Sequence, residues 1–324
     1  MSESLSTKKI IFFGTASFAV DILKGLSEKK IPLAWIISQP DRPAGRKKIP
    51  KASPVTLWAK KENLPLQQFE KLDEKALDFL KKEQPDLFLV AAYGKILPKE
   101  ILAIPSFGAI NVHGSLLPLH RGASPVQEVL LTGQKETGIS LILMNEKMDA
   151  GPLLVQKKIL IEKKDDYLSL EKKLAQLSAE ILPETLVQWL DKKITPQQQN
   201  EKLATFCPLI KKVDGEIDWG KPAEEIFNRF RAFSVWPGVY SFWTKKENSR
   251  LKISLFPKNF QPDNPSSQTL PEGKVFLTEQ GELAVKANPG FLEIESLQLE
   301  GKKKMKAREF LLGQKTFLSA ILEK

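Results

Sequence analysis

The sequence is poor in the residues that build disulfides and metal sites. Its 324 residues include one cysteine, Cys207, and two histidines, His113 and His120. A single cysteine excludes an internal disulfide, and no cysteines or histidines have metal-ligand spacing, so we expect no bound metal. Long apolar runs are also missing: residues 87–92 fall far short of the roughly 20 that cross a bilayer, and 10–13 are too few for a signal peptide. We therefore expect a cytoplasmic protein that does not contact membranes.

Positive charge is in excess, with 49 lysines and arginines against 39 acidic residues and a net charge of +10. Such an excess favours a polyanionic partner, because phosphates attract these cations whatever the base sequence. The excess gathers in two segments, one with Arg42, Arg46, Lys47, Lys48 and Lys51 and the other with Lys302, Lys303, Lys304, Lys306 and Arg308. The first segment, rich in proline, favours phosphate contact. The second is a weaker signal, because such a stretch is commonly just a solvated surface, although it would suit a barrel that follows a nucleic-acid backbone.

The first half of the chain alternates strand and helix patterns. Apolar runs predict buried strands, and apolar residues at three- and four-residue spacing predict the helices between them. We expect strands at 9–13, 33–38, 86–92, 109–113, 138–143 and 153–161, and helices at 18–26, 54–62, 72–80, 125–131 and 167–190. Segment 39–51 is expected to be an exposed loop, Ser53 a helix N-cap, and Pro183 a candidate kink. This order predicts an α/β fold with an open, mostly parallel, Rossmann-like sheet.

The pattern changes in the second half of the chain. A helix at 223–233 is followed by short strands at 239–243, 251–256, 273–276, 282–285 and 291–297, with Gly, Pro, Asn and Asp between them. This predicts a small β-barrel or sandwich, and of the two we expect an OB-like barrel. We expect a first domain at 1–189, a polar linker at 190–206 and the barrel at 207–324. The aromatic residues of its first strand region are expected in the core: Trp236, Tyr240, Phe242 and Trp243.

Two polar residues at the end of one strand indicate carbonyl chemistry. Asn111 and His113 are two residues apart in an otherwise apolar strand, so both side chains project from one face. An amide can donate a hydrogen bond to a developing oxyanion, and an imidazole can donate one or move a proton, which suits acyl transfer. The alternative is a strand end whose polar side chains only form hydrogen bonds within the fold and take no part in catalysis. Because both histidines of the chain fall within 113–120, we favour the functional interpretation.

The turn after the first strand offers a second place for a ligand. Gly14 follows that strand and opens a helix, but the glycines of the dinucleotide-binding pattern G-x-G-x-x-G are missing, so NAD binding is not expected. Parallel sheets hold ligands beyond the carboxyl ends of their strands. Gly14, Asn111 and His113 all occupy such ends, and we expect the site there.

Several motifs resemble one family. Asn111 to Pro118, followed by Arg121-Gly122, Glu136-Thr137-Gly138 and Asp149-Ala150-Gly151, resembles the signature of the folate-dependent formyltransferases. Within that superfamily, four further segments resemble the methionyl-tRNA formyltransferases: 39–46, 92–94, 231–233 and 236–237. The resemblance extends from about Ile10 to beyond Lys304.

This resemblance implies 10-formyltetrahydrofolate as co-substrate and methionyl initiator tRNA as partner, in a monomeric enzyme. Catalysis is implied for Asn111, His113 and Asp149, folate binding for Ser115, Leu116, Leu117 and Pro118, and tRNA contact for Phe18, Arg42, Arg46, Lys47 and Lys48. Asp149 would orient the imidazole of His113 and help to take a proton from the attacking amine. The sequence alone equally allows Asp149 to be a turn residue beside Gly151.

Two other functions remain open on the sequence. The chain could formylate a small amine, such as glycinamide ribonucleotide or an amino-sugar nucleotide, although such substrates need neither the basic segment nor a second domain. It could also be a noncatalytic tRNA-binding protein, although all three candidate catalytic residues are present. The first loop departs from the family because Ala16-Ser17 replaces a proline followed by an acidic residue, so we expect a slightly more flexible loop. No catalytic role is expected for His120.

Overall fold

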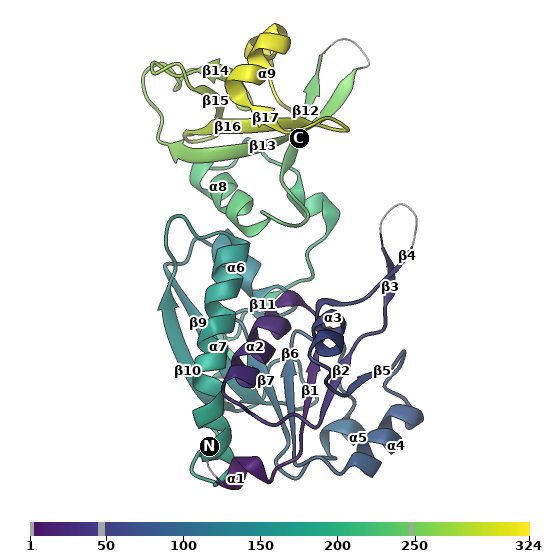
Figure 1. The fold of residues 1–324 in the computed structure, drawn as a ribbon. Helices are drawn as coiled ribbons and strands as arrows, with labels where there is room; N and C mark the ends of the chain where they lie inside the picture. The colour runs from purple at the N-terminus through teal and green to yellow at the C-terminus, as the bar shows by residue number, and fades with distance from the viewer. Residues whose placement is uncertain (1–2, 45–48, 246–248) are drawn as a thin grey trace. The chain divides into compact units, whose positions relative to one another are not determined.

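The computed structural model describes residues 3–44, 49–245 and 249–324. The chain divides into two compact units, whose elements are labelled in Figure 1. The first unit comprises residues 1–125, 136–161 and 169–208, and the second comprises 126–135, 162–168 and 209–324. Two short segments that precede residue 169 thus belong to the second unit.

The first unit is built on a seven-stranded sheet with the order β10-β9-β7-β6-β1-β2-β5. Its strands are β1 (Ile10–Gly14), β2 (Trp35–Ser38), β5 (Leu66–Gln68), β6 (Leu87–Ala91), β7 (Ala109–His113), β9 (Glu136–Leu143) and β10 (Leu153–Leu160). The strands from β5 to β7 are parallel, whereas β9 runs antiparallel to both of its neighbours. The predicted open, mostly parallel sheet is confirmed.

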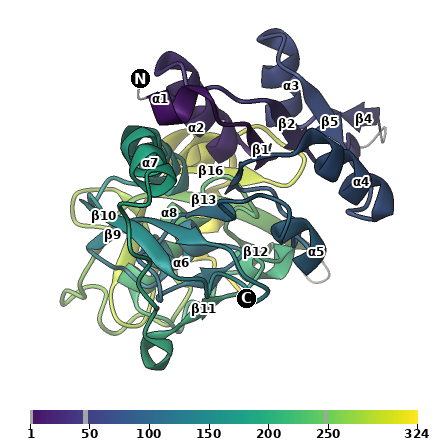
Figure 2. The ribbon, with the colours of Figure 1, turned by 90° about the horizontal axis from the view of Figure 1, so that it is seen from below.

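Helices cover both faces of this sheet (Figures 1 and 2). They are α1 (Glu3–Ser6), α2 (Ser17–Glu28), α3 (Pro54–Lys61), α4 (Glu74–Glu83), α5 (Lys99–Leu102) and α7 (Tyr167–Leu190). Ala76 of α4 and Ile101 of α5 share a core with Phe13 of β1. On the other face α2 and α7 touch so closely that a Cβ on Gly25 would lie 2.3 Å from the Cβ of Ala179. The sheet is therefore buried on both sides, as its apolar strands require.

The region 39–51 is not a plain loop, and that prediction was wrong. Strands β3 (Arg42–Ala44) and β4 (Ile49–Lys51) form an antiparallel hairpin in which Pro43 lies opposite Pro50. A proline fits such a ribbon at positions whose N–H makes no bond across it, so prolines alone did not exclude a strand. The predicted cap is confirmed, because Ser53 Oγ accepts the Thr56 N–H at 3.0 Å. α7 continues through Pro183 as one helix.

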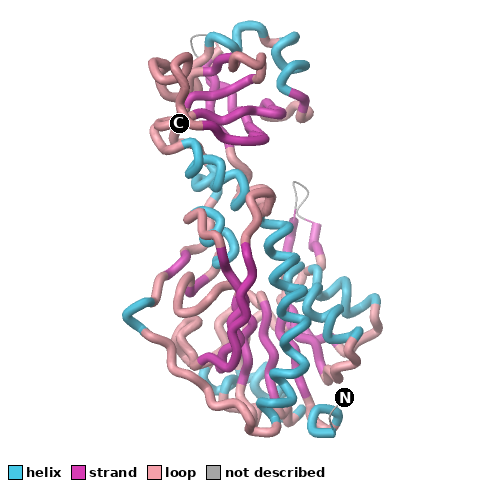
Figure 3. The backbone as a smooth tube through the Cα atoms, turned by 90° about the vertical axis from the view of Figure 1, so that its left-hand side faces the viewer, coloured by secondary structure: helices cyan, strands magenta, loops and turns pink. Residues whose placement is uncertain are grey.

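The second unit contains a curled antiparallel sheet of its own (Figure 3). Strand order is β12-β13-β16-β15-β14, and β17 pairs with β16. The strands are β12 (Tyr240–Thr244), β13 (Arg250–Gln261), β14 (Val275–Leu277), β15 (Leu283–Lys286), β16 (Phe291–Leu299) and β17 (Met305–Lys306). Helices α8 (Ala223–Ala232) and α9 (Ala307–Gly313) and the 3₁₀ turns at Lys212–Gly215 and Lys315–Ser319 belong to the same unit, as does most of α6 (Pro125–Leu131).

Residues 320–323 close this sheet into a barrel. Phe242 of β12 exchanges backbone hydrogen bonds with Glu323, and Leu322 N–H donates to Gly273 O beside β14 at 2.8 Å. Both edges of the sheet are thereby paired, which confirms the predicted barrel. Among its aromatic residues, Trp243 is buried as predicted, but Trp236 is 51% exposed, because it precedes β12 and does not share the alternation of that strand.

No helix of the described part of the chain is long and apolar enough to cross a membrane.

Candidate active site

The candidate site is built around the carboxyl end of β7. This strand lies between β6 and β9, with Asn111 beside Val90 and Ile142 and with His113 beside Ser140. Its apolar residues hold it in the sheet, while Asn111 and His113 project from one face. Asn111 is partly exposed, whereas the side chain of His113 is only 5% exposed.

Asp149 meets both of these residues, an arrangement that the family resemblance implied. Asn111 Nδ2 donates to Asp149 Oδ1 at 3.2 Å, and His113 Nδ1 lies 3.5 Å from Asp149 Oδ2. The N–H of Gly122 donates to the same Oδ2 at 2.9 Å. Asp149 has a left-handed backbone with φ of 50°, a conformation that aspartate tolerates better than most residues. The carboxylate is therefore held between one amide, one imidazole and one backbone N–H.

The second nitrogen of His113 is also engaged. His113 Nε2 lies 3.0 Å from the backbone oxygen of His120. Because a carbonyl oxygen only accepts hydrogen bonds, Nε2 is the protonated nitrogen here, and Nδ1 faces Asp149. His120 thus contributes its main chain, and its N–H is fixed in turn by Thr205 Oγ1 at 2.8 Å. The imidazole plane is set by groups on both sides.

The turn at 115–118 leads directly out of β7. Ser115 Oγ donates to Leu119 O at 2.6 Å, and the N–H of Leu117 donates to Ser140 Oγ at 3.0 Å. Ser115 and Leu117 are buried, so their side chains stabilise the turn. Leu116 and Pro118 are partly exposed. Sequence reasoning grouped these four residues together, but the structure gives the two pairs different environments.

The Gly14 turn is fastened to the segment after β6. The N–H groups of Thr15 and Ala16 both donate to Ala92 O, at 3.1 and 3.4 Å, and Thr15 Oγ1 donates to Tyr93 O at 2.9 Å. A proline at position 16 could not donate the second of these bonds, so alanine adds a contact where the family pattern has proline. Phe18 is 8% exposed and packs at the start of α2.

The base of the β3–β4 hairpin is polar and ordered. Gln68 Nε2 donates to Gln39 O, Asp41 Oδ1 and Thr56 Oγ1 at 2.9 to 3.0 Å. Arg42 projects outward with a 61% exposed side chain and forms a 3.6 Å ion pair with the exposed Glu70. The three predicted tRNA residues Arg46, Lys47 and Lys48 lie outside the described residues.

The positive charge of Arg42 affects a neighbouring lysine, Lys95. Lys95 Nζ donates to the backbone oxygens of Phe69 and Glu70 at 2.9 and 2.8 Å. Burial, and secondly the Arg42 cation, lower the pKa of Lys95. Since a second cation disfavours the charged form of the first, an anion placed here would relieve the repulsion.

Sequence reasoning missed the residues that surround the Asp149 loop. Gln199, from the segment predicted as a linker, donates to the backbone oxygens of Asp149 and Gly151, and it accepts from Arg121. Arg121 is 2% exposed and also pairs with Glu201 at 2.8 Å, a hydrogen bond that lowers the pKa of Glu201. Arg121 belonged to a recognised motif, but a glutamine in a glutamine-rich polar segment gave no signal.

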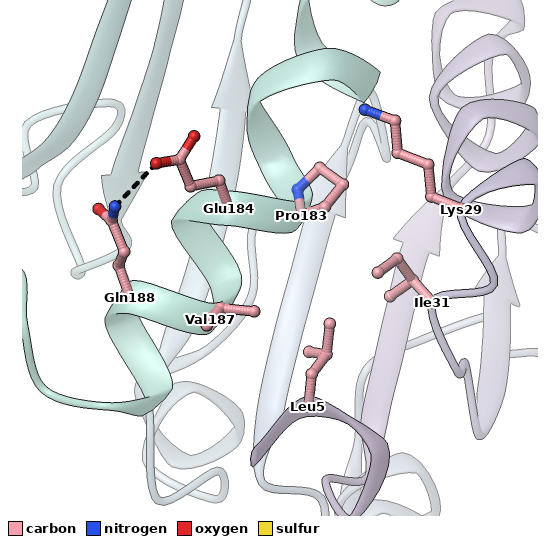
Figure 4. Close-up of a pocket in the computed structure, with 7 residues that line it drawn as sticks. All are labelled: Leu5, Lys29, Ile31, Pro183, Glu184, Val187 and Gln188. Carbon is pink, nitrogen blue, oxygen red and sulfur yellow. Dashed lines mark hydrogen bonds between the residues drawn. The ribbon is translucent and has the colours of Figure 1, made fainter. Parts of the chain in front are cut away.

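A separate pocket of about 390 Å³ lies near the opposite ends of the sheet's strands (Figure 4). Its lining residues are Leu5, Lys29, Ile31, Pro183, Glu184, Val187 and Gln188. Leu5 and Ile31 precede β1 and β2, so the pocket is near the amino ends of these strands, whereas the polar residues described above gather at carboxyl ends. The described residues contain no group of three or more His, Cys, Asp or Glu arranged to hold a metal.

Comparison with known proteins identifies the family. The formyl transferase domain matches residues 8–186, and the formyl transferase C-terminal domain matches residues 209–315. The methionyl-tRNA formyltransferase of Caldicellulosiruptor saccharolyticus is 42% identical over 309 residues, covering 94% of this chain and 97% of the relative. That of Halalkalibacterium halodurans is 39% identical over 312 residues, covering 96% of each chain.

Solved structures share the fold at low sequence identity. HypX from Aquifex aeolicus in complex with tetrahydrofolic acid has a TM-score of 0.60 at 14% identity, covering 98% of this chain and 48% of HypX. An N-formyltransferase from Helicobacter canadensis, solved with folinic acid and dTDP-3-aminofucose, has a TM-score of 0.60 at 16% identity, covering 92% of this chain and 99% of its own. From its two matching domains and its near full-length relatives, we conclude that this chain belongs to the formyl transferase family.

Proposed function

We propose that this protein transfers the formyl group of 10-formyltetrahydrofolate to the α-amino group of methionyl initiator tRNA. The product would be the N-formylmethionyl-tRNA used in translation initiation. The observation that carries the proposal is that the carboxylate of Asp149 lies 3.2 Å from Asn111 Nδ2 and 3.5 Å from His113 Nδ1. It is supported by the near full-length methionyl-tRNA formyltransferase relatives.

Asn111 is suited to stabilise the oxyanion. The neutral α-amino nitrogen attacks the formyl carbon carried by N10 of the folate, and the formyl oxygen gains negative charge. Asn111 Nδ2 has two hydrogens, and one of them is donated to Asp149 at 3.2 Å. Because Asn111 is partly exposed, its second hydrogen is available to the substrate oxygen. Loss of one such donor typically lowers turnover on the order of 100- to 1000-fold.

Asp149 and His113 are suited to manage the protons. When the tetrahedral intermediate collapses, the bond between the formyl carbon and N10 breaks, N10 takes one proton and the amine nitrogen gives one up. Asp149, whose side chain is 13% exposed, accepts the amine proton directly or through water. His113 Nε2 faces the His120 carbonyl at 3.0 Å in this structure, so its N–H would exchange that carbonyl for the reacting oxygen when the substrate binds, with Asp149 still facing Nδ1. The step needs no oxidant and no covalent intermediate on the enzyme.

We assign folate contact to the turn at 115–118. Leu116 and Pro118 are partly exposed and would contact the ligand themselves. Ser115 and Leu117 are buried and would act by holding the turn in shape through Leu119 O and Ser140 Oγ. This division follows from exposure, since a ligand reaches only side chains that water also reaches.

We assign tRNA contact to the barrel, with the catalytic domain at 1–189 and the barrel domain at 207–324. Three cations project from its outer face over aromatic rings: Arg250 lies 3.9 Å from the ring centre of Phe242, Lys252 3.3 Å from that of Tyr240, and Lys304 3.6 Å from that of Phe256. In β13 these outward residues alternate with the buried Ile253 and Leu255. A row of cations on a barrel surface suits a phosphate backbone.

We assign a second tRNA contact to the β3–β4 hairpin, through Arg42 together with Arg46, Lys47 and Lys48. The exposed ion pair of Arg42 with Glu70 is weak and would give way readily to a phosphate. Phe18 is too deeply buried to stack on a base, so we give it an indirect role, that of fixing the Gly14 turn. The catalytic candidates Asn111, His113 and Asp149 all come from one unit of one chain, which supports a monomer, and we place it in the cytoplasm, where charged tRNA is found.

The test is a formyl-transfer assay with 10-formyltetrahydrofolate and methionyl initiator tRNA, run beside methionyl elongator tRNA and a small amino-sugar nucleotide. We expect transfer to the initiator tRNA. Absence of transfer in the presence of an active control enzyme would refute the proposal. Transfer to the amino-sugar nucleotide alone would mean that the acceptor is this small amine and not tRNA. Size-exclusion chromatography of the same sample tests whether the protein is a monomer.

A further inference from the structure

We propose that Gln199 is a positioning residue that sets the place of Asp149 at the reacting centre. The inference rests on the proposed function, because it concerns the same formyl-transfer site. Gln199 touches neither Asn111 nor His113 in the described contacts. It acts through the backbone of the loop that carries Asp149.

The side chain of Gln199 makes four hydrogen bonds to two separate segments. Its Nε2 donates to Asp149 O at 2.8 Å and to Gly151 O at 2.7 Å, which uses both hydrogens of the amide. Its Oε1 accepts from Arg121 Nε at 3.2 Å and from Arg121 Nη2 at 2.8 Å. With 8% of its surface exposed, Gln199 is a buried link between Arg121 and the Asp149 loop.

These bonds close a ring around the catalytic carboxylate. Gln199 holds the main chain of Asp149, and the carboxylate of Asp149 accepts the N–H of Gly122 at 2.9 Å. Gly122 is covalently joined to Arg121, whose guanidinium returns to Gln199. Asp149 is thus restrained at its backbone and its side chain by the two halves of one ring. Among the described side-chain contacts, only Gln199 binds the backbone of Asp149. Loss of Gln199 therefore breaks the ring at that point.

The loop needs such a restraint because its backbone is unusual. Asp149 has φ of 50°, and a Cβ added to Gly151 would lie 1.6 Å from Leu143 O, so the loop is pressed against the end of β9. A left-handed aspartate is a sparsely populated conformation that persists when its surroundings hold it. The two amide hydrogens of Gln199 bind the carbonyls on either side of this turn.

The segment around Gln199 is itself fixed to the first unit. Gln197 and Leu153 exchange backbone hydrogen bonds at 2.7 and 2.8 Å, and the N–H of Arg121 donates to Thr205 O at 2.9 Å. Glu201 pairs with the buried Arg121 at 2.8 Å and offsets its charge. Gln199 is therefore presented to the Asp149 loop from a segment that is anchored before and after it.

A neutral amide suits this position better than a carboxylate. Glutamate at 199 would keep the acceptor for Arg121, but it would lose both donated bonds. It would also place an anionic oxygen against the carbonyls of Asp149 and Gly151. Methionine would remove the polar contacts at similar length without adding charge. The adjacent Gln198 is exposed, so Gln198→Glu makes the same chemical change without touching the ring.

The experiment compares Gln199→Glu, Gln199→Met and Gln198→Glu with the wild type. Formyl transfer is measured at varied concentrations of both substrates, and hydrogen exchange is followed in the peptide spanning 147–153. For both Gln199 variants we expect kcat to fall by roughly 10- to 100-fold, because an ångström of misplacement costs about that much, while KM changes less than about threefold. We expect faster exchange in 147–153 and unchanged behaviour in Gln198→Glu.

Two results would overturn the inference. One is a Gln199→Met protein that folds, as judged by its unfolding transition, and keeps wild-type kcat. The other is an unchanged exchange rate in 147–153, which can be read whether or not the protein is active. A wild-type protein that transfers no formyl group would instead overturn the proposed function, while the exchange measurement would still decide whether Gln199 restrains the loop.

Discussion

The two units present their functional groups in opposite ways. In the α/β unit, Asn111 and His113 lie in a buried strand and Asp149 lies on a loop, and all three are fixed by neighbours that are mostly inaccessible to water. In the barrel, Arg250 and Lys252 lie on the outer face of a strand whose alternate residues fill the core. Chemistry at one carbon atom requires fixed positions, whereas phosphate binding requires reach and exposure. Mutations should therefore lower kcat in the first unit and raise KM in the second.

The largest effect is expected from Asp149→Asn. An amide retains the shape of the carboxylate but cannot accept the amine proton, so kcat should fall on the order of 100- to 10,000-fold. The KM for tRNA should change little, because the tRNA contacts that we propose lie elsewhere. Steady-state kinetics with both substrates measures the two constants, and Asp21→Asn on α2, an exposed position, provides the control. A large rise in KM with normal kcat would contradict the division between the units.

A smaller effect, on the KM for tRNA and not on kcat, is expected from Lys252→Ala combined with Lys304→Ala. Loss of two phosphate contacts should raise the KM for tRNA roughly tenfold and lower the slope of log affinity against log salt by about 2. Tests at two or more salt concentrations measure this slope. Lys258→Ala on the same strand is the matched control, because Lys258 is already paired with Glu282 at 3.2 Å. Equal salt slopes for the wild type, the double variant and Lys258→Ala would show that this face of the barrel does not contact tRNA.

Arg42→Ala should have a weaker effect of the same kind. One exposed cation is lost, so the KM for tRNA should rise about fivefold while folate affinity, measured by equilibrium binding, stays unchanged. Glu70→Gln removes only the partner of its 3.6 Å ion pair and should leave tRNA use intact or slightly improved. Wild-type kinetics for Arg42→Ala would show that the hairpin does not contact tRNA.

The smallest effect concerns stability. Tyr93 is 2% exposed, and its hydroxyl has no hydrogen-bond partner among the described residues. Tyr93→Phe should therefore raise the free energy of unfolding by about 1 kcal/mol. Burial raises the pKa of Tyr93 from 10.0 to about 12, so the unfolded chain ionises first and the wild type loses stability as the pH rises from 10 towards 12.

The phenylalanine variant lacks this loss. Its advantage in urea unfolding should grow between pH 9 and pH 11, as follows from the two pKa values of Tyr93. A constant difference over that range would mean that the hydroxyl finds a partner in solution.

The sequence predicted the parts of the molecule that depend on local pattern. Asn111 and His113 could be placed on one face because the side-chain period of a strand is two. The helix beginning after Ser53 followed from its cap, and its Oγ accepts the Thr56 N–H as predicted. Asp149 came from resemblance alone, since its distance in sequence from His113 gave no physical reason for the two to meet.

Contacts between distant segments could not be predicted in this way. Gln199 meets Asp149 across 50 residues, and the residue type carries no distinguishing signal in a glutamine-rich segment. The barrel closure joins Glu323 to the distant Phe242 through backbone groups, which every residue possesses. The pairing of 42–44 with 49–51 has no local signal either, because prolines predict a loop, whereas Pro43 and Pro50 lie opposite each other in the paired strands.

The pairing of Glu323 with Phe242 has a consequence for biosynthesis. Until residues 320–323 have been synthesised, β14 and part of β12 lack their edge partner, and the barrel of the nascent chain stays open. Unpaired edges invite pairing with other chains. The α/β unit has most of its sequence available long before that moment, since synthesis proceeds at about 5 to 20 residues per second. The barrel should therefore be the part of the newborn protein that most needs protection by a chaperone.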